Sequence, residues 1–144
     1  MGLATAEPSS PHLMLSAQLV SELGDAHSTL RATAERCDSA VIVYAGGEVD
    51  GCNEHTWQRL LSEVATIVTS PGSLVLDVTG LEFMACCAFA ALAEEADRCR
   101  RRGVKLCLVS LESGVARTVH ACGLADVLPV YVTADAALSA EPVC

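Results

Sequence analysis

The order of two hydrophobic periods along the chain limits its fold more than any other feature of the sequence. Continuous apolar runs of strand length lie at 40–46, 73–78 and 104–110, and such runs are typical of strands buried on both faces. The intervening segments 46–68 and 86–102 carry apolar residues three and four positions apart, as amphipathic helices do. Because parallel strands are joined by crossover connections of this kind, the alternation predicts an α/β fold.

Shorter elements complete this pattern. Residues 30–37 predict an edge strand, which a turn at Asp38 and Ser39 would join to the next strand as a hairpin. Towards the C-terminus we expect a helix at 113–123, a strand at 127–133 and a helix at 134–140. The complete pattern is a mixed, mostly parallel sheet of four to five strands with about four helices.

The helices show which of their sides should be buried and where they should begin. In the helix at 86–102 the charged side, expected to face solvent, contains Glu94, Glu95, Asp97 and Arg98. The basic run Arg100–Arg102 and the following Gly103 are typical of a solvated last turn. Candidate capping residues are Asp50 or Asn53 for the helix in 46–68 and Ser113 for the helix at 113–123.

The length of 144 residues fits one domain with a single core. Residues 1–27 contain Pro8, Pro11 and several serines, so we expect a flexible N-terminal arm there, with at most a short amphipathic helix. The domain itself is expected to span 28–144.

The formal net charge of -9 argues against a nucleic-acid groove or an anionic membrane surface as the partner. No apolar run approaches the roughly 20 residues of a membrane span, and the N-terminus lacks the basic region of a secretory signal. These features favour a cytoplasmic protein that binds another protein or a small ligand.

The eight cysteines are irregularly spaced, unlike a disulfide framework in a small secreted domain. Cys99, Cys107 and Cys122 fall on apolar faces and are expected to be core residues. The sequence lacks paired metal-ligand motifs, a phosphate-binding glycine loop and a G-x-S-x-G elbow. We therefore expect no metal and no cofactor.

Two adjacent cysteines, Cys86 and Cys87, lie where a strand leads into a helix. A helix N-terminus would lower the pKa of the Cys87 thiol, as a catalytic cysteine requires, although no histidine is near in sequence to act as a base. A disulfide between the pair would be strained and easily reduced, which suits a redox switch better than a structural bond.

Three stretches together resemble the STAS domains of bacterial anti-sigma factor antagonists, over about Leu30 to Leu138. "VYAGGEVDGCNEHTWQRLL" resembles their G-E-L-D strand, loop and helix, and "LVLDVTGLEFMACCAFAAL" resembles their central strand, D-S-S-G turn and helix. "LESGVARTVHACGLADVLPVYVTADAAL" is similar to the closing helix, G-L turn, strand and final helix.

The resemblance implies a non-enzymatic regulator of transcription and stress response. Family members bind an anti-sigma factor that is also a serine kinase, and thereby release a sigma factor. Phosphorylation of the second serine of D-S-S-G ends this binding. The matching residues are Gly47, Glu48, Asp50, Asp77, Gly80 and Phe83, whereas Ala85, Cys86, Cys87 and Ala88 replace D-S-S-G. Cys87 therefore occupies the phosphoacceptor position, and Thr79 and Thr118 are weaker substitute candidates.

Three readings follow from the resemblance. The chain is an antagonist without the phosphorylation switch, a regulator that uses oxidation of Cys86 and Cys87, or a STAS scaffold in a larger complex. An exposed apolar surface at Met84, Ala85, Ala88 and Phe89 would suit any protein interface. The residues expected to bind the partner are Glu48, Asp50, Gly51, Asn53, Met84, Ala85, Cys86, Cys87 and Phe89.

Overall fold

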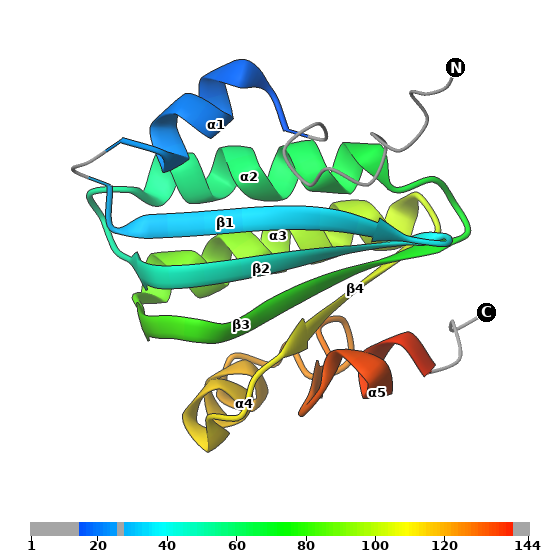
Figure 1. Ribbon diagram of the computed structural model, residues 1–144. Helices are drawn as coiled ribbons and strands as arrows, with labels where there is room; N and C mark the ends of the chain where they lie inside the picture. Colours follow the sequence, from blue (N-terminus) through cyan, green and yellow to red (C-terminus); the bar gives the residue numbers. More distant parts are fainter. Residues whose placement is uncertain (1–14, 26–27, 140–144) are drawn as a thin grey trace, which may run out of the picture.

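The computed structural model describes residues 15–25 and 28–139 (Figure 1). In this part of the chain one five-stranded sheet has the order β1-β2-β3-β4-β5, with β1 antiparallel to β2 and the other pairs parallel. The predicted mixed, mostly parallel α/β sheet is confirmed, with five helices around it. The elements are α1 (Ala17–Leu23), β1 (Leu30–Cys37), β2 (Ala40–Val49), α2 (Glu54–Ile67), β3 (Gly72–Met84), α3 (Cys86–Arg101), β4 (Val104–Val109), α4 (Ser113–Ala121), β5 (Val130–Tyr131) and α5 (Ala134–Ser139).

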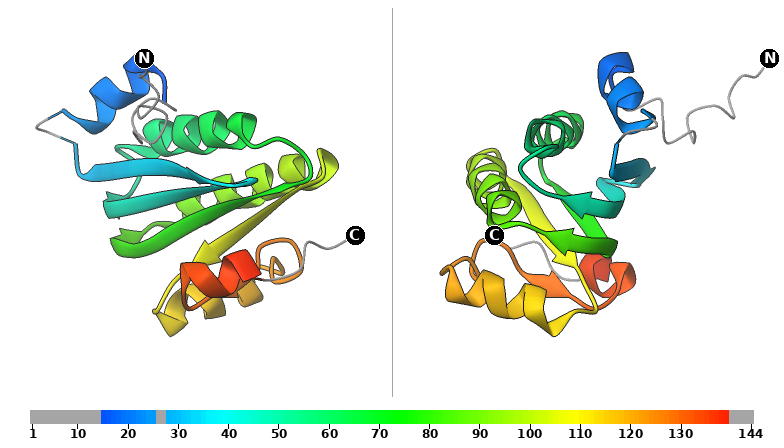
Figure 2. Two further views of the ribbon diagram at one scale, coloured as in Figure 1. Left: turned by 45° about the vertical axis from the view of Figure 1, so that its right-hand side comes forward. Right: turned by 90° about the vertical axis from the view of Figure 1, so that its left-hand side faces the viewer.

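Helices cover both faces of the sheet, as Figure 2 shows from two sides. In β3, Leu74 and Leu76 belong to the main core, which also contains the apolar sides of α2 and α3. Val75, between them, belongs to a second cluster with Ala137 of α5. Because successive side chains of a strand point to opposite faces, this two-sided cover explains the continuous apolar runs of the central strands.

Strands β2 and β3 run further than the sequence predicted. The expected ends were residues 46 and 78, but β2 continues to Val49 and β3 to Met84. The two extensions pair with each other in parallel, from Gly46 opposite Gly80 to Val49 opposite Met84. The extensions are not evident from the sequence, because glycine and polar residues interrupt the apolar run by which a strand is identified.

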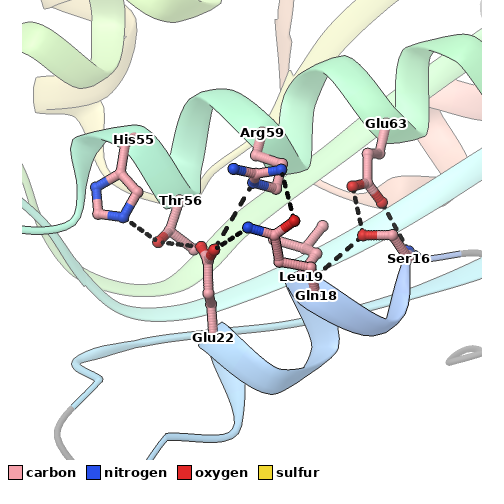
Figure 3. A network of polar contacts seen from close by, with 8 residues as sticks. All are labelled: Ser16, Gln18, Leu19, Glu22, His55, Thr56, Arg59 and Glu63. Atoms are coloured by element: carbon pink, nitrogen blue, oxygen red, sulfur yellow. Dashed lines mark hydrogen bonds and ion pairs between the residues drawn. The ribbon is translucent and has the colours of Figure 1, made fainter.

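Residues 15–25 pack on the domain, unlike the flexible arm expected there. Leu15 and Leu19 are buried in the main core, and full burial of a leucine stabilises a fold by about 1.5–3 kcal/mol. Polar contacts with α2 flank them, because Ser16 donates from its amide and hydroxyl to the Glu63 carboxylate at 2.7 and 2.6 Å (Figure 3). Residues 1–14 of the expected arm lie outside the described part of the chain.

At the other end of α1, Glu22 contacts two side chains of α2 (Figure 3). The Thr56 hydroxyl donates to a Glu22 carboxylate oxygen at 2.8 Å, and Arg59 Nε lies 3.8 Å from the other oxygen. The short helix is therefore fastened to α2 at both of its ends, with Leu19 buried between them.

Several details of the helices differ from the expectation. Glu95 is only 5% exposed, where it accepts a hydrogen bond from Arg98 at 2.9 Å in the shallow groove between α2 and α3, so its predicted solvent-facing position is wrong. Arg102 is exposed, as expected for the last turn of α3, but it also has partners on α2. Its guanidinium donates to the carbonyl oxygens of Ala65 and Val68 at 2.7 and 2.9 Å, and so satisfies the last turn of α2.

Two further corrections concern α4. Ser113 is its first helical residue and Glu112 holds the capping position, without a side-chain capping bond. Cys122, expected in the core, follows the last helical residue and is exposed, whereas Cys99 and Cys107 are buried as predicted. A residue beyond a helix end no longer follows the period that places an apolar face.

Candidate functional site

The site lies at the C-terminal ends of β2 and β3, where the two segments expected to bind a partner are side by side. Glu48 is opposite Phe83 and Val49 is opposite Met84 in the parallel pairing. Beyond the strands, the Ala85 amide donates to the carbonyl oxygen of Val49 at 2.9 Å. The structure therefore joins the loop after β2 to the start of α3.

Two glycines allow the chain to approach itself this closely. Gly47 has a φ of +93°, and a Cβ atom there would lie 1.8 Å from the Thr29 carbonyl oxygen. A Cβ atom on Gly80 would lie 2.9 Å from the carbonyl oxygen of Ala45 on the neighbouring strand. Side chains at either position would push these backbones apart, which explains why the two resemblance motifs carry glycine here.

Asn53 holds the loop after β2 in one shape. Its side-chain oxygen accepts from the Asp50 amide at 3.0 Å, and its Nδ2 donates to the Glu48 carbonyl oxygen at 2.9 Å and to the Thr29 hydroxyl at 3.0 Å. Asn53 occupies the capping position of α2 but makes no side-chain capping bond, contrary to the expected cap. The loop tip, with Cys52, is exposed.

The start of α3 is only partly exposed. Cys86 is exposed and Cys87 is half-buried, whereas Ala88 and Phe89 are buried at 0% and 7% exposure. The expected apolar surface is therefore wrong for Ala88 and Phe89, because the first turn of α3 rotates them towards the core. The buried indole of Trp57 on α2 fixes this turn, since its Nε1 donates to the Ala88 carbonyl oxygen at 3.2 Å.

The pKa of the Cys87 thiol is raised, contrary to the lowering expected at a helix N-terminus. Partial burial is the largest cause, followed by the nearby negative charge of Glu54, with a smaller contribution from Asp50. The amides of Cys87 and Ala88 act in the opposite direction but are outweighed. Both burial and negative neighbours disfavour a thiolate, so they work against Cys87 as a nucleophile.

The two core cysteines are still less reactive. Burial raises the pKa values of Cys99 and Cys107 to about 11, so both thiols are protonated at neutral pH. Within residues 15–25 and 28–139, no group of three or more histidine, cysteine, aspartate or glutamate side chains is placed to hold a metal ion.

Sequence reasoning did not select Phe83 as a site residue, yet its side chain is 52% exposed beside Glu48. It lines a groove of about 670 Å³ between the last residues of β3 and helix α4. Phe83 is present in the sequence as a large apolar residue of the resemblance motif. Its exposure depends on the extension of β3, which the sequence pattern did not predict.

A membrane-crossing helix would have to be longer and more apolar than any helix found in the described residues.

Comparisons with known proteins agree with this architecture. The STAS domain family model matches residues 31–137. The chain is 60% identical over 139 residues to the candidate anti-anti-sigma factor Rv2638 of Mycobacterium tuberculosis, covering 96% of this chain and 93% of that protein. It is 56% identical over 113 residues to the anti-sigma-F factor antagonist RsfA of the same species, covering 78% and 88%.

A solved structure shares the fold. The crystal structure of an anti-sigma factor antagonist from Mycobacterium paratuberculosis superposes with a TM-score of 0.68 at 23% sequence identity, covering 80% of this chain and 96% of that chain.

Proposed function

Because the chain belongs to the STAS domain family, we propose that it is an anti-sigma factor antagonist, which binds an anti-sigma factor and so releases a sigma factor. The observation that supports this most is the surface formed by two loops at the ends of β2 and β3, joined by the bond from the Ala85 amide to Val49. Two relatives with names of this kind are 56% and 60% identical to the chain.

The chemistry of this surface suits a partner that is basic around an apolar centre. The negative charges of Asp50 and Glu54 act on Cys87, and Glu48 pairs with the exposed Phe83. Opposite charges across an interface increase the association rate and exclude wrong partners. We assign contacts with the partner to Glu48, Asp50, Gly51, Asn53, Met84, Ala85, Cys86 and Cys87, with Phe89 supporting them from the core.

We also propose that the antagonist lacks the phosphorylation switch. A serine kinase transfers the γ-phosphoryl group of ATP to a hydroxyl oxygen, releasing ADP, and the hydroxyl proton passes to a base. At position 87 this chain has a thiol, with a raised pKa, in place of a hydroxyl. A phosphate dianion at this position would disrupt the interface through its bulk and through repulsion by the neighbouring Glu54 and Asp50. It has no acceptor here, and binding persists in the presence of ATP.

The other readings receive less support. A redox switch at Cys86 and Cys87 needs a thiolate to initiate exchange, and the raised pKa of Cys87 opposes its formation. The same raised pKa opposes a catalytic role for Cys87, which supports a regulator that acts by binding. We place the protein in the cytoplasm, where sigma factors act.

The test uses the purified chain and the anti-sigma-F factor of Mycobacterium tuberculosis, with and without its sigma factor. We expect a complex by biolayer interferometry and displacement of the sigma factor, both unchanged by ATP. The C87S variant should gain phosphate by intact-protein mass spectrometry and lose binding in ATP. C52S, at the exposed loop cysteine, is the matched control and should gain none.

The outcomes separate the readings. An absence of binding to this factor and to other serine-kinase anti-sigma factors would exclude the antagonist role and favour a scaffold. Binding that changes only after oxidation of the wild-type chain, and not after oxidation of C87S, would favour the redox reading. Phosphorylation of the wild-type chain would show that another residue, such as Thr79, had replaced position 87.

A further inference from the structure

Strand β3 has a free edge in its C-terminal part. Its pairing with β4 ends where Asp77 lies opposite Val109, but β3 continues to Met84. From Val78 onwards, β3 pairs with β2 alone in the described part of the chain. The side turned away from β2 therefore carries backbone groups without a strand partner. The Thr79 amide is satisfied by a side chain, since it donates to Asp77 Oδ1 at 3.0 Å.

Bulges explain why β4 does not follow β3 further. The register with β2 shifts twice, and each shift places one more residue in β3 than in β2, near Thr79 and at Glu82. Bulges bend a strand and increase its twist, which moves this part of β3 out of line with β4. They also limit any new pairing along this edge to a short segment.

A groove lies along the free edge. Its walls are residues 78–84 of β3 on one side and Val115 and Thr118 of α4 on the other, and its volume is about 670 Å³. Phe83 provides an exposed apolar surface in it. The only charged side chains that line the groove are Glu82 and Glu112, both acidic. The groove therefore combines backbone hydrogen-bonding groups, apolar surface and negative charge.

The opposite edge of the sheet differs in its charges. That edge is formed by β1, whose exposed side chains include Arg31, Glu35 and Arg36, of both signs. Charged side chains on an edge strand commonly prevent another strand from adding to it. The β3 edge, which lies beside a groove with acidic side chains of one sign, is better suited to receive a chain.

We propose that the groove between β3 and α4 binds a short extended segment of the anti-sigma factor, in which apolar residues alternate with lysine or arginine. Its backbone would pair with the free edge of β3, as in other complexes where a peptide extends a sheet. An apolar side chain would contact Phe83 and Val115, and basic side chains would face Glu82 and Glu112. This identity of the partner rests on the proposed function.

The first experiment measures binding of the anti-sigma-F factor to the charge-reversed variant E82K/E112K. We expect at least a tenfold loss of affinity. At higher salt most of this loss should disappear, and only the apolar contact should remain. The control E35K/D135K changes the net charge equally at exposed residues outside the groove, and should stay within twofold of wild type. Circular dichroism melting checks that both variants fold.

The second experiment needs no anti-sigma factor. A nine-residue peptide in which valine alternates with lysine or threonine is titrated into the ¹⁵N-labelled chain, beside versions with N-methylated backbone or with glutamate for lysine. We expect amide shifts at 78–84 with the first peptide and at least tenfold weaker binding of the other two. Loss of this binding in E82K/E112K would locate the peptide in the groove.

The two experiments fail in different ways. If the anti-sigma-F factor binds wild type and E82K/E112K equally, the groove proposal is overturned while the proposed function stands. If the factor does not bind at all, the proposed function fails and the peptide alone decides whether the groove accepts an extended chain. Equal binding of the N-methylated peptide, or no peptide binding, would overturn strand addition.

Discussion

The two halves of β3 differ in what surrounds them. From Ser73 to Asp77 the strand pairs with β2 and β4, and its central residues Leu74 and Leu76 are buried in the main core together with residues of α2 and α3. From Val78 to Met84 it pairs on one side only, and Phe83 is half exposed. One strand therefore carries the centre of the core at one end and the candidate binding surface at the other, which separates stability from recognition along its length.

The largest effect is expected in the doubly paired half. Leu76→Ala removes a side chain that is 1% exposed and leaves a cavity in the main core, which should lower the free energy of unfolding by about 2–5 kcal/mol. Urea denaturation of both proteins measures this loss.

Phe83→Ala is the matched change in the other half. Because Phe83 is 52% exposed, we expect a change in unfolding free energy within about 0.5 kcal/mol, together with weaker binding of the anti-sigma factor. Equal destabilisation by the two substitutions would contradict the separation of roles.

Gly47→Ala tests the pairing with β2, the strand that remains beside the second half of β3. Gly47 pairs with Leu81, has a positive φ, and leaves no room for a Cβ atom beside Thr29. We expect a loss of about 1–3 kcal/mol in unfolding free energy. The control Gly51→Ala, where nothing lies within 4 Å of the added atom, should unfold like wild type; a loss in both variants would point to the loop as a whole.

Hydrogen exchange compares the halves directly. Amides at 74–77 should exchange at least about tenfold more slowly than those at 80–84 that face away from β2, because local opening needs less free energy where fewer partners are lost. Exchange resolved by NMR provides the measurement. Uniform protection along the strand would show that the free edge is covered.

Thiol titration gives the smallest effect and follows the same contrast. Cys107, opposite Val75 of the doubly paired half, should resist iodoacetamide until the pH approaches its pKa of about 11. The half-buried Cys87 should react at lower pH, though above the usual range for a thiol. Glu54→Gln removes a negative charge that disfavours the thiolate, so it should lower the pKa of Cys87, as alkylation followed by mass spectrometry can detect.

The core could be predicted from the sequence because buried elements carry apolar residues at a regular spacing. The apolar run around Val75 predicted a strand covered on both faces, and both covers are present. The extension to Met84 could not be predicted in the same way, since its stability depends on pairing with Gly46–Val49 and not on its own residues. Glu95 was placed wrongly because its burial depends on Arg98 and on the neighbouring helix.

The candidate site was predicted as two separate segments, and their meeting followed from the resemblance. What the sequence did not contain was the geometry between them. The thiol pKa of Cys87 is raised by burial and by Glu54 of another element, and the bonds of Asn53 reach back to Thr29. Interactions between residues far apart in the chain decide these properties, so a local pattern cannot reveal them.

The hydrogen bond from Trp57 to Ala88 also makes Trp57 a fluorescent reporter of the first turn of α3. Trp57 is the single tryptophan of the chain, and its indole is enclosed in the core while it holds the first turn of α3. Any event that shifts this turn changes the surroundings of Trp57, and the tryptophan emission of the chain comes from this residue alone. Docking at Cys87 that moves this turn can therefore be followed in real time by intrinsic fluorescence, without a label and without altering a residue.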